Sequence, residues 1–175
     1  MLFKVEDDAL ISAWRRRCFQ WRLIKVIVAV FAVGMALWAL TPVASLGWNE
    51  TTSLPGKVYA VAHMQRPEKG QLAAFYPPKN PYYPREMWFT KIIVGEAGDV
   101  ISHRGRTVLI NGQEIGVARE TDSEHRRRLP MIQDGVIPEG YYFVWTPHPR
   151  SYDSRYADIG LVHEKRIIGR AYRLF

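Results

Sequence analysis

The sequence predicts a mainly β domain, a folded sheet or barrel, behind one N-terminal membrane-spanning helix. Two observations predict this arrangement. Residues 26–48 contain no charged side chain and are rich in apolar residues, which is typical of a membrane span. Residues 49–175 instead carry seven short runs rich in apolar and β-branched residues, with turn signals between them. The predicted parts are residues 1–25, a basic segment, residues 26–48, the anchor, and residues 49–175, the folded domain.

The anchor is predicted from length and flanking charge. As a helix, residues 26–48 would rise roughly 34 Å, enough to cross the hydrocarbon core. Basic residues precede the span, namely Arg15, Arg16, Arg17, Arg22 and Lys25. The positive-inside rule therefore predicts a cytoplasmic N-terminus, with the folded domain across the membrane. A cleaved signal peptide is the alternative, because Ala44 and Ser45 are small residues near the end of the run, but the length of the run favours an anchor.

The strands of the folded domain are predicted from seven runs. These are residues 57–62, 71–75, 87–94, 100–102, 107–115, 141–145 and 165–172. Within the fifth run, Asn111-Gly112 predicts a two-residue hairpin turn, because both residue types tolerate positive φ. Residues 76–85 contain four prolines and are predicted to form an exposed loop, since proline cannot donate a ladder hydrogen bond.

Composition excludes several function classes. With the single cysteine Cys18, the chain forms neither an intrachain disulfide nor a multi-cysteine zinc site. The net charge of +7 is spread along the chain without a basic stripe interleaved with aromatics, which argues against a nucleic-acid partner. Phosphate-loop, HExxH and Gly-x-Ser-x-Gly motifs are absent, and the histidines are scattered. We therefore expect no metal and no cofactor.

One remaining chemistry is a serine nucleophile activated by a lysine. A lysine base must lose about 3 units of pKa, which burial among apolar neighbours can supply. Lys91 lies in the most apolar predicted strand, residues 87–94. An outward-facing lysine on a half-solvated strand is the alternative, because buried lysines are uncommon. The residue types alone leave both alternatives open.

Ser53 is the candidate nucleophile. It follows the anchor within a few residues, so its hydroxyl would reach a bond close to the bilayer, as a membrane-bound protein substrate requires. Pro55, with its fixed φ, would hold the preceding residues extended. By itself, this segment also fits an ordinary turn.

Three segments together resemble the signal peptidase I superfamily, peptidase family S26, and within it the TraF-type peptidases of bacterial conjugation systems. Residues 51–59, TTSLPGKVY, are similar to the nucleophile box of the family. Residues 91–100, KIIVGEAGDV, resemble its lysine box K-x-x-x-G-x-x-G-D. Residues 151–156, SYDSRY, match its S-x-D-S-R box. The boxes occur in the order of the family and follow a suitably oriented span.

The resemblance implies a role for each matching residue. Ser53 would be the nucleophile and Lys91 the base that takes its proton. The Thr51 hydroxyl and the Ser53 backbone N–H would form the oxyanion site. Ser151 would orient the lysine amine.

Two further residues of the third box also receive roles from the resemblance. Asp153 and Arg155 would pair and hold the box in place, and in TraF-type members this aspartate is counted among the functionally required residues. One segment departs from the family pattern. Signal peptidases usually carry Gly-Asp-Asn just before the third box, where this chain has Trp145-Thr146-Pro147.

The implied function is acyl transfer at the bacterial inner membrane, with the catalytic domain in the periplasm. The TraF-type resemblance implies a pilin precursor as substrate, the bilayer as a partner, and other proteins of the conjugation machinery as further partners. Water would release a cleaved product, whereas the N-terminal amine of the substrate would close a ring, and no residue in the sequence separates the two outcomes. The alternatives are a general signal peptidase I acting on secreted preproteins and a non-catalytic, membrane-tethered scaffold.

Overall fold

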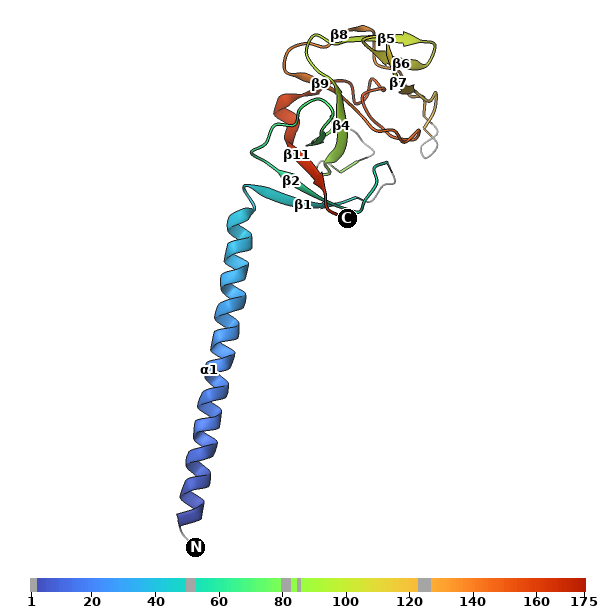
Figure 1. The fold of residues 1–175 in the computed structure, drawn as a ribbon. Helices are drawn as coiled ribbons and strands as arrows, with labels where there is room; N and C mark the ends of the chain where they lie inside the picture. Colours follow the sequence, from blue (N-terminus) through green and yellow to red (C-terminus); the bar gives the residue numbers. More distant parts are fainter. Residues whose placement is uncertain (1–2, 50–52, 80–82, 85, 123–126) are drawn as a thin grey trace. The chain divides into compact units, whose positions relative to one another are not determined.

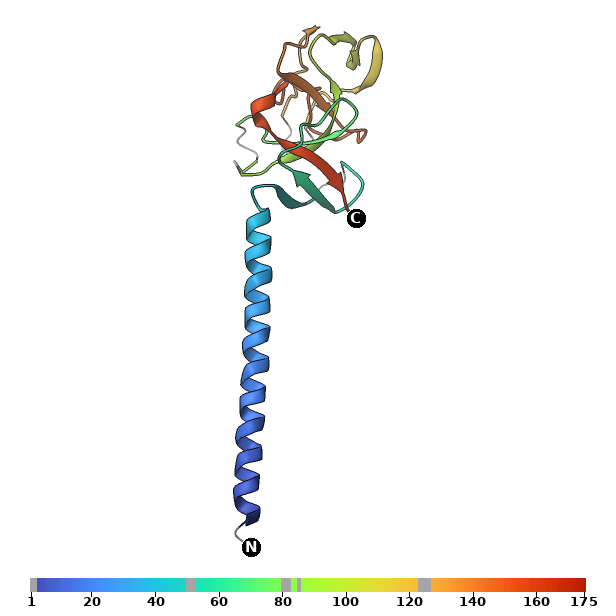
Figure 2. The same cartoon turned by 60° about the vertical axis from the view of Figure 1, so that its left-hand side comes forward.

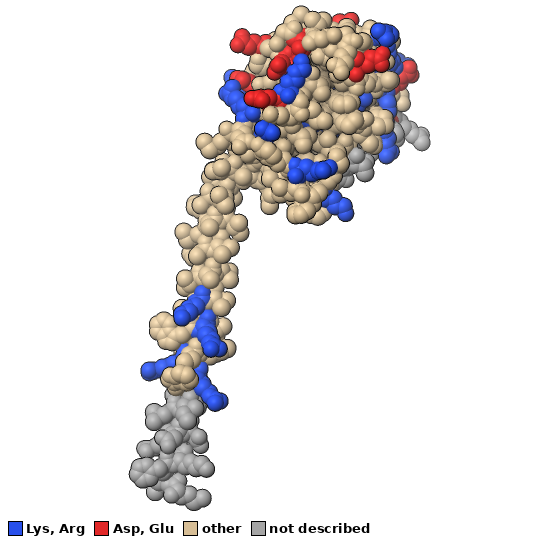
Figure 3. Space-filling model, viewed as in Figure 1, with Lys and Arg blue, Asp and Glu red and all other residues tan. Residues whose placement is uncertain are grey.

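The computed structural model describes residues 3–49, 53–79, 83–84, 86–122 and 127–175, and the chain divides into two compact units, residues 1–42 and 43–175. The first unit is the helix α1, Phe3–Leu40 (Figure 1). Its part Trp14–Leu40 is long and apolar enough to cross a membrane. In Figure 3 the basic side chains coloured blue on α1 gather on one stretch of the helix, and no charged residue separates that stretch from Leu40.

The helix ends earlier at its C-terminal end than the predicted span of residues 26–48. It ends at Leu40, and β1, Ala44–Trp48, already belongs to the folded domain. Pro42 lacks the backbone N–H that another helical turn needs and disfavours helical dihedrals at the residue before it. The backbone of β1 is instead paired with β2, Val58–Ala62, from Ala44 opposite Ala62 to Trp48 opposite Val58.

The second unit consists of two antiparallel sheets, which confirms the predicted mainly β fold. The larger sheet has the order β1-β2-β11-β3-β4-β9-β10. Its remaining strands are β3, Leu72–Phe75, β4, Phe89–Gly95, β9, Tyr141–Trp145, β10, Val162–His163, and β11, Ile167–Arg173. A one-turn 3₁₀ helix, Glu164–Arg166, precedes β11. Figure 2 shows β11, in red, beside β2, with which it pairs.

The smaller sheet has the order β7-β6-β5-β8. Its strands are β5, Val100–Arg104, β6, Thr107–Ile110, β7, Gln113–Val117, and β8, Gly135–Val136. Each of the seven predicted runs contains a strand, and the fifth forms the hairpin β6–β7. Asn111 and Gly112 adopt φ values of 52° and 79° at its turn, as the Asn-Gly pair predicts. β8 and β10 were not predicted, because two residues are too few to show a periodic pattern.

Three apolar clusters form the core, and one of them lies beneath the predicted nucleophile segment. It contains Leu54, Tyr59, Val61, Ala74 and Ala171, drawn from the segment after Ser53 and from β2, β3 and β11. Leu54 is therefore buried directly beside Ser53 in the sequence. Burial of this side chain ties the local backbone to the large sheet.

Candidate active site

Lys91 lies on the buried face of β4. Exposure alternates along this strand, so that Lys91, Ile93 and Gly95 point into the protein, and Lys91 is only 5% exposed. The pleat alternates faces with period two, which places the amine on the same side as the buried Ile93. The alternative of an outward-facing lysine is therefore wrong.

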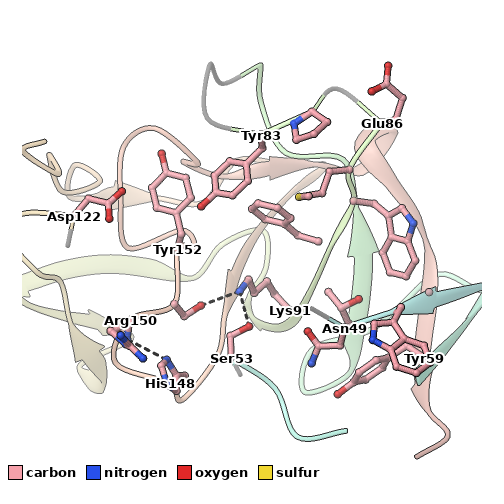
Figure 4. Close-up of a pocket in the computed structure, with 18 of the residues that line it drawn as sticks. Asn49, Ser53, Tyr59, Tyr83, Glu86, Lys91, Asp122, His148, Arg150 and Tyr152 are labelled. Atoms are coloured by element: carbon pink, nitrogen blue, oxygen red, sulfur yellow. Dashed lines mark hydrogen bonds between the residues drawn. The ribbon is translucent and has the colours of Figure 1, made fainter. Parts of the chain in front are cut away.

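The Lys91 amine, from the second sequence box, contacts a serine of the first box and a serine of the third. Its Nζ donates a hydrogen bond to Ser151 Oγ at 2.9 Å and lies 3.5 Å from Ser53 Oγ (Figure 4). Ser151 is itself buried. These contacts join residues that are 38 and 60 positions apart in the sequence.

Burial lowers the pKa of Lys91 from 10.5 to about 8, because the low-polarity surroundings disfavour the ammonium. The negative charge of Asp153 raises this pKa, and the positive charge of Arg155 lowers it. Lys91 Nζ also lies 5.8 Å from the ring centre of Phe89. At a pKa near 8, a usable share of the amine is neutral and able to accept a proton.

The third box is held together by a buried ion pair. Arg155 Nε lies 2.8 Å from Asp153 Oδ1, and Arg155 NH2 donates to Asp153 Oδ2 at 3.0 Å, a two-point contact that fixes both groups. Asp153 is fully buried and Arg155 is 2% exposed. The guanidinium also donates to the carbonyl oxygens of Ser151 and Val117, at 3.1 and 3.0 Å. The pair therefore fixes the backbone of Ser151 behind the Lys91 amine.

The six sequence-predicted site residues thus fall into three groups. Ser53, Lys91 and Ser151 meet in one place, while Asp153 and Arg155 pair behind them. Thr51, the expected contributor to an oxyanion site, lies outside the described residues.

A groove with a volume of about 930 Å³ opens at Ser53 and Lys91. Part of its wall is apolar or aromatic and comes from β1, β2 and the segment before β4, with Leu46, Trp48, Tyr59, Met87 and Trp88. Another part is polar, with Arg119, Asp122, His148, Arg150 and Tyr152. In Figure 4 the Ser53 and Lys91 side chains lie between Tyr59 on one side and His148 and Arg150 on the other. A chain segment lying along the groove would pass the Ser53 hydroxyl.

The sequence reasoning missed the contribution of β1, because it assigned residues 44–48 to the anchor. Leu46, Gly47, Trp48 and Asn49 all line the groove. Gly47 has a specific role there, since a Cβ at this position would come 2.0 Å from the Trp88 indole. The alternation of Ala44, Leu46 and Trp48 with Ser45 and Gly47 after Pro42 is the sequence signal that predicts a strand here.

Comparison with known proteins shows the family of this chain. The sequence profile of the family described as signal peptidase, peptidase S26, matches residues 18–175. The chain belongs to this family. All three boxes lie inside the matched region, so the resemblance read from them is confirmed.

One protein and one solved structure, each from a bacterium, are similar to this S26 family member. The conjugal transfer protein TraF of Agrobacterium fabrum (strain C58 / ATCC 33970) is 27% identical over 171 residues, which covers 86% of this chain and 95% of the relative. The crystal structure of a signal peptidase I from Enterococcus faecalis V583 is 26% identical, covers 61% of this chain and 97% of its own, and gives a TM-score of 0.39. Family membership indicates a serine peptidase that acts on a protein substrate.

Proposed function

We propose that this S26 peptidase is a membrane-anchored Ser/Lys enzyme that processes a pilin precursor. The observation that carries the catalytic part is the buried Lys91 amine, held by Ser151 at 2.9 Å and placed 3.5 Å from Ser53 Oγ. A serine hydroxyl is a weak nucleophile until a neighbouring base takes its proton. In this groove the amine of lowered pKa supplies that base.

The first half-reaction forms an ester. Ser53 Oγ attacks the carbonyl carbon of the scissile peptide bond, and the hydroxyl proton passes to Lys91 Nζ. The negative charge on the carbonyl oxygen needs donors, for which the Ser53 backbone N–H and the Thr51 hydroxyl are the candidates. When the tetrahedral intermediate collapses, the C–N bond breaks and the Lys91 ammonium gives its proton to the leaving amine.

The second half-reaction releases Ser53. An incoming nucleophile attacks the ester carbon and loses its proton to Lys91, which then returns a proton to Ser53 Oγ as the C–O bond breaks. Water gives a linear product, and the N-terminal amine of the substrate gives a cyclic one. Within this scheme Asp153 and Arg155 hold Ser151, and Ser151 holds the Lys91 amine in line with the hydroxyl.

The substrate and the topology are supported by the TraF relative and by the flanking charges of α1. A relative that aligns over 95% of its length and is called a conjugal transfer protein supports a substrate from a conjugation system, for which a pilin precursor is the candidate. The basic residues of α1 precede the uncharged span, which supports a cytoplasmic N-terminus and a domain of residues 43–175 in the periplasm.

The test of this function is the processing of a propilin by membranes that contain the full chain. We expect a shortened product with the wild type and none with Ser53→Ala. Mass spectrometry distinguishes the linear product from the cyclic one, because the cyclic product is one water lighter. Efficient cleavage of unrelated secretory preproteins would instead indicate a general signal peptidase, and processing by Ser53→Ala would exclude Ser53 as the nucleophile.

The pH dependence of the reaction follows from the lowered pKa of Lys91. Only the neutral amine accepts a proton, so activity is expected to increase with pH and to level off above a midpoint of about 8. About one tenth of the amine is neutral at pH 7 and about nine tenths at pH 9. Initial rates of propilin processing from pH 6 to 10 check this. A rate that does not increase between pH 7 and 9 would contradict Lys91 as the base.

A further inference from the structure

The segment of residues 53–57 leads into β2, and its main chain is held at several points. Asn49 N–H donates to the Lys57 carbonyl at 2.7 Å, which extends the β1–β2 ladder beyond Trp48. The Asn49 side-chain Nδ2 donates to the carbonyl oxygens of Leu54 and Gly56, at 3.1 and 3.0 Å. The Tyr59 hydroxyl donates to the Pro55 carbonyl between them. Three consecutive carbonyl groups after Ser53 are therefore hydrogen-bonded to the side chains of Asn49 and Tyr59.

We propose that Asn49 is a positioning residue for Ser53, a role that rests on the proposed Ser/Lys function. The Nδ2 group of Asn49 has two hydrogens, and the two carbonyl oxygens lie within hydrogen-bond distance of that one nitrogen. By holding the Leu54 carbonyl, the amide fixes the peptide group that follows the nucleophile. The Leu54 side chain is also buried. The backbone next to Ser53 is therefore fixed both by the hydrogen bond to the Leu54 carbonyl and by the packing of the Leu54 side chain.

The opposite side of the segment is fixed by the residues that follow β11. Lys57 N–H donates to the Phe175 carbonyl at 2.7 Å. Gly56 has a φ of +96°, and a Cβ there would come 2.4 Å from the same Phe175 oxygen. This positive φ allows the Gly56 carbonyl to reach Asn49 while the chain passes close to β11. The segment thus lies between Asn49 on one side and Phe175 on the other.

Accurate placement matters because the catalytic distance is already long. The 3.5 Å between Lys91 Nζ and Ser53 Oγ is at the outer limit for a hydrogen bond. Lys91 is anchored separately, on β4 and by Ser151, so it does not follow a shift of the Ser53 segment. A displacement of Ser53 by about 1 Å would interrupt proton transfer and lower the rate by up to about a hundredfold.

Two substitutions of Asn49 test the proposal in the full-length chain. Asn49→Ala removes both donors, and Asn49→Asp keeps the shape but places a carboxylate against two carbonyl oxygens. We expect kcat for propilin processing to fall roughly ten- to a hundredfold in the alanine variant, and at least as far in the aspartate variant. In the alanine variant KM should stay within about twofold, and the pH midpoint should remain near 8, because no charge is added or removed near Lys91.

Gln71→Ala is the matched control. Its side-chain Oε1 accepts the Glu68 N–H at 3.0 Å in the turn before β3, and Gln71 does not line the groove. This variant also loses a hydrogen bond between a side-chain amide and the backbone of the same domain, although here the amide oxygen accepts, so kcat should equal that of the wild type. Melting temperatures are measured for all variants, and kinetics are compared well below the lowest of them.

The outcomes distinguish the positioning role of Asn49 from the proposed Ser/Lys function. The positioning role would be overturned if Asn49→Asp had the kcat of the wild type. It would also be overturned if the loss of kcat disappeared once the rates were corrected for the folded fraction of each variant. Tyr59→Phe, which removes only the donor to Pro55, is the second variant if Asn49→Ala does not fold, and an unchanged kcat there would also count against the proposal. If Ser53→Ala still processes the substrate, the proposed function fails. If Ser53→Ala is inactive and Asn49→Ala is fully active, only the role of Asn49 fails.

Discussion

Lys91→Met is expected to reduce propilin processing at least about a thousandfold and, at the same time, to make the folded domain more stable at pH 7. The loss of turnover follows because methionine cannot accept the Ser53 proton, and loss of a catalytic base typically costs several orders of magnitude. The gain in stability follows because the substitution removes a buried group that is mostly charged at neutral pH. Loss of activity with gain of stability is typical of a side chain retained for chemistry.

The sign and size of the stability effect follow from the pKa difference. The pKa of Lys91 is about 8 in the folded chain and 10.5 when fully solvated. Below pH 8 both states bind the proton, and the folded state carries the full cost of the buried charge. Between pH 8 and 10.5 the unfolded state binds more protons, so the free energy of unfolding rises with pH. The difference between wild type and Lys91→Met should therefore be about 3 kcal/mol at pH 7 and disappear above pH 10.5.

Chemical denaturation at pH 7, 9 and 10.5, together with the processing assay, measures both effects. Lys165→Met is the matched control, since this lysine is exposed in the 3₁₀ helix before β11. It should keep full activity and change the free energy of unfolding by less than about 0.5 kcal/mol. An active Lys91→Met, or one whose stability difference from wild type does not vary with pH, would contradict the assignment of Lys91 as a buried base.

Asp153→Ala is expected to destabilise the folded domain by about 3–5 kcal/mol. The substitution leaves the Arg155 guanidinium buried without its carboxylate, and breaking one partner of a buried pair leaves an uncompensated charge. Processing should also fall, because Arg155 holds the Ser151 carbonyl and Ser151 Oγ accepts from Lys91. Urea denaturation measures the first effect, and the processing assay at a temperature where the variant is folded measures the second.

Glu114→Ala is the control for the buried pair. It breaks the contact between Arg104 and Glu114 in the small sheet, in which both side chains are largely exposed. A solvated pair of this kind contributes about 0–1 kcal/mol. If Asp153→Ala cost no more than Glu114→Ala, the ion pair behind Ser151 would not be what holds the third box.

Much of the strand structure could be predicted because it depends on neighbours in the sequence. The run around Lys91 is apolar and rich in β-branched residues, and the Asn111-Gly112 turn follows from the φ that these two residues tolerate. The C-terminal end of the apolar helix could not be located by hydropathy, because residues 44–48 are as free of charge as a membrane span. Their pairing with β2 depends on residues that lie further along the chain. For the same reason Asn49 showed no signal, since its contacts are made only after the chain turns back.

The sequence by itself determined the seven strand runs, the uncharged span and three boxes whose order identifies the family. The tertiary structure alone decided that Lys91 points inward, that Ser53 and Ser151 lie beside its amine, and that its pKa is lowered to about 8. The physical reason is that a pattern of residue types reports local backbone preference, whereas burial and a shifted pKa depend on which distant atoms surround a group. In this protein those atoms come from β4 and from segments 38 and 60 residues away.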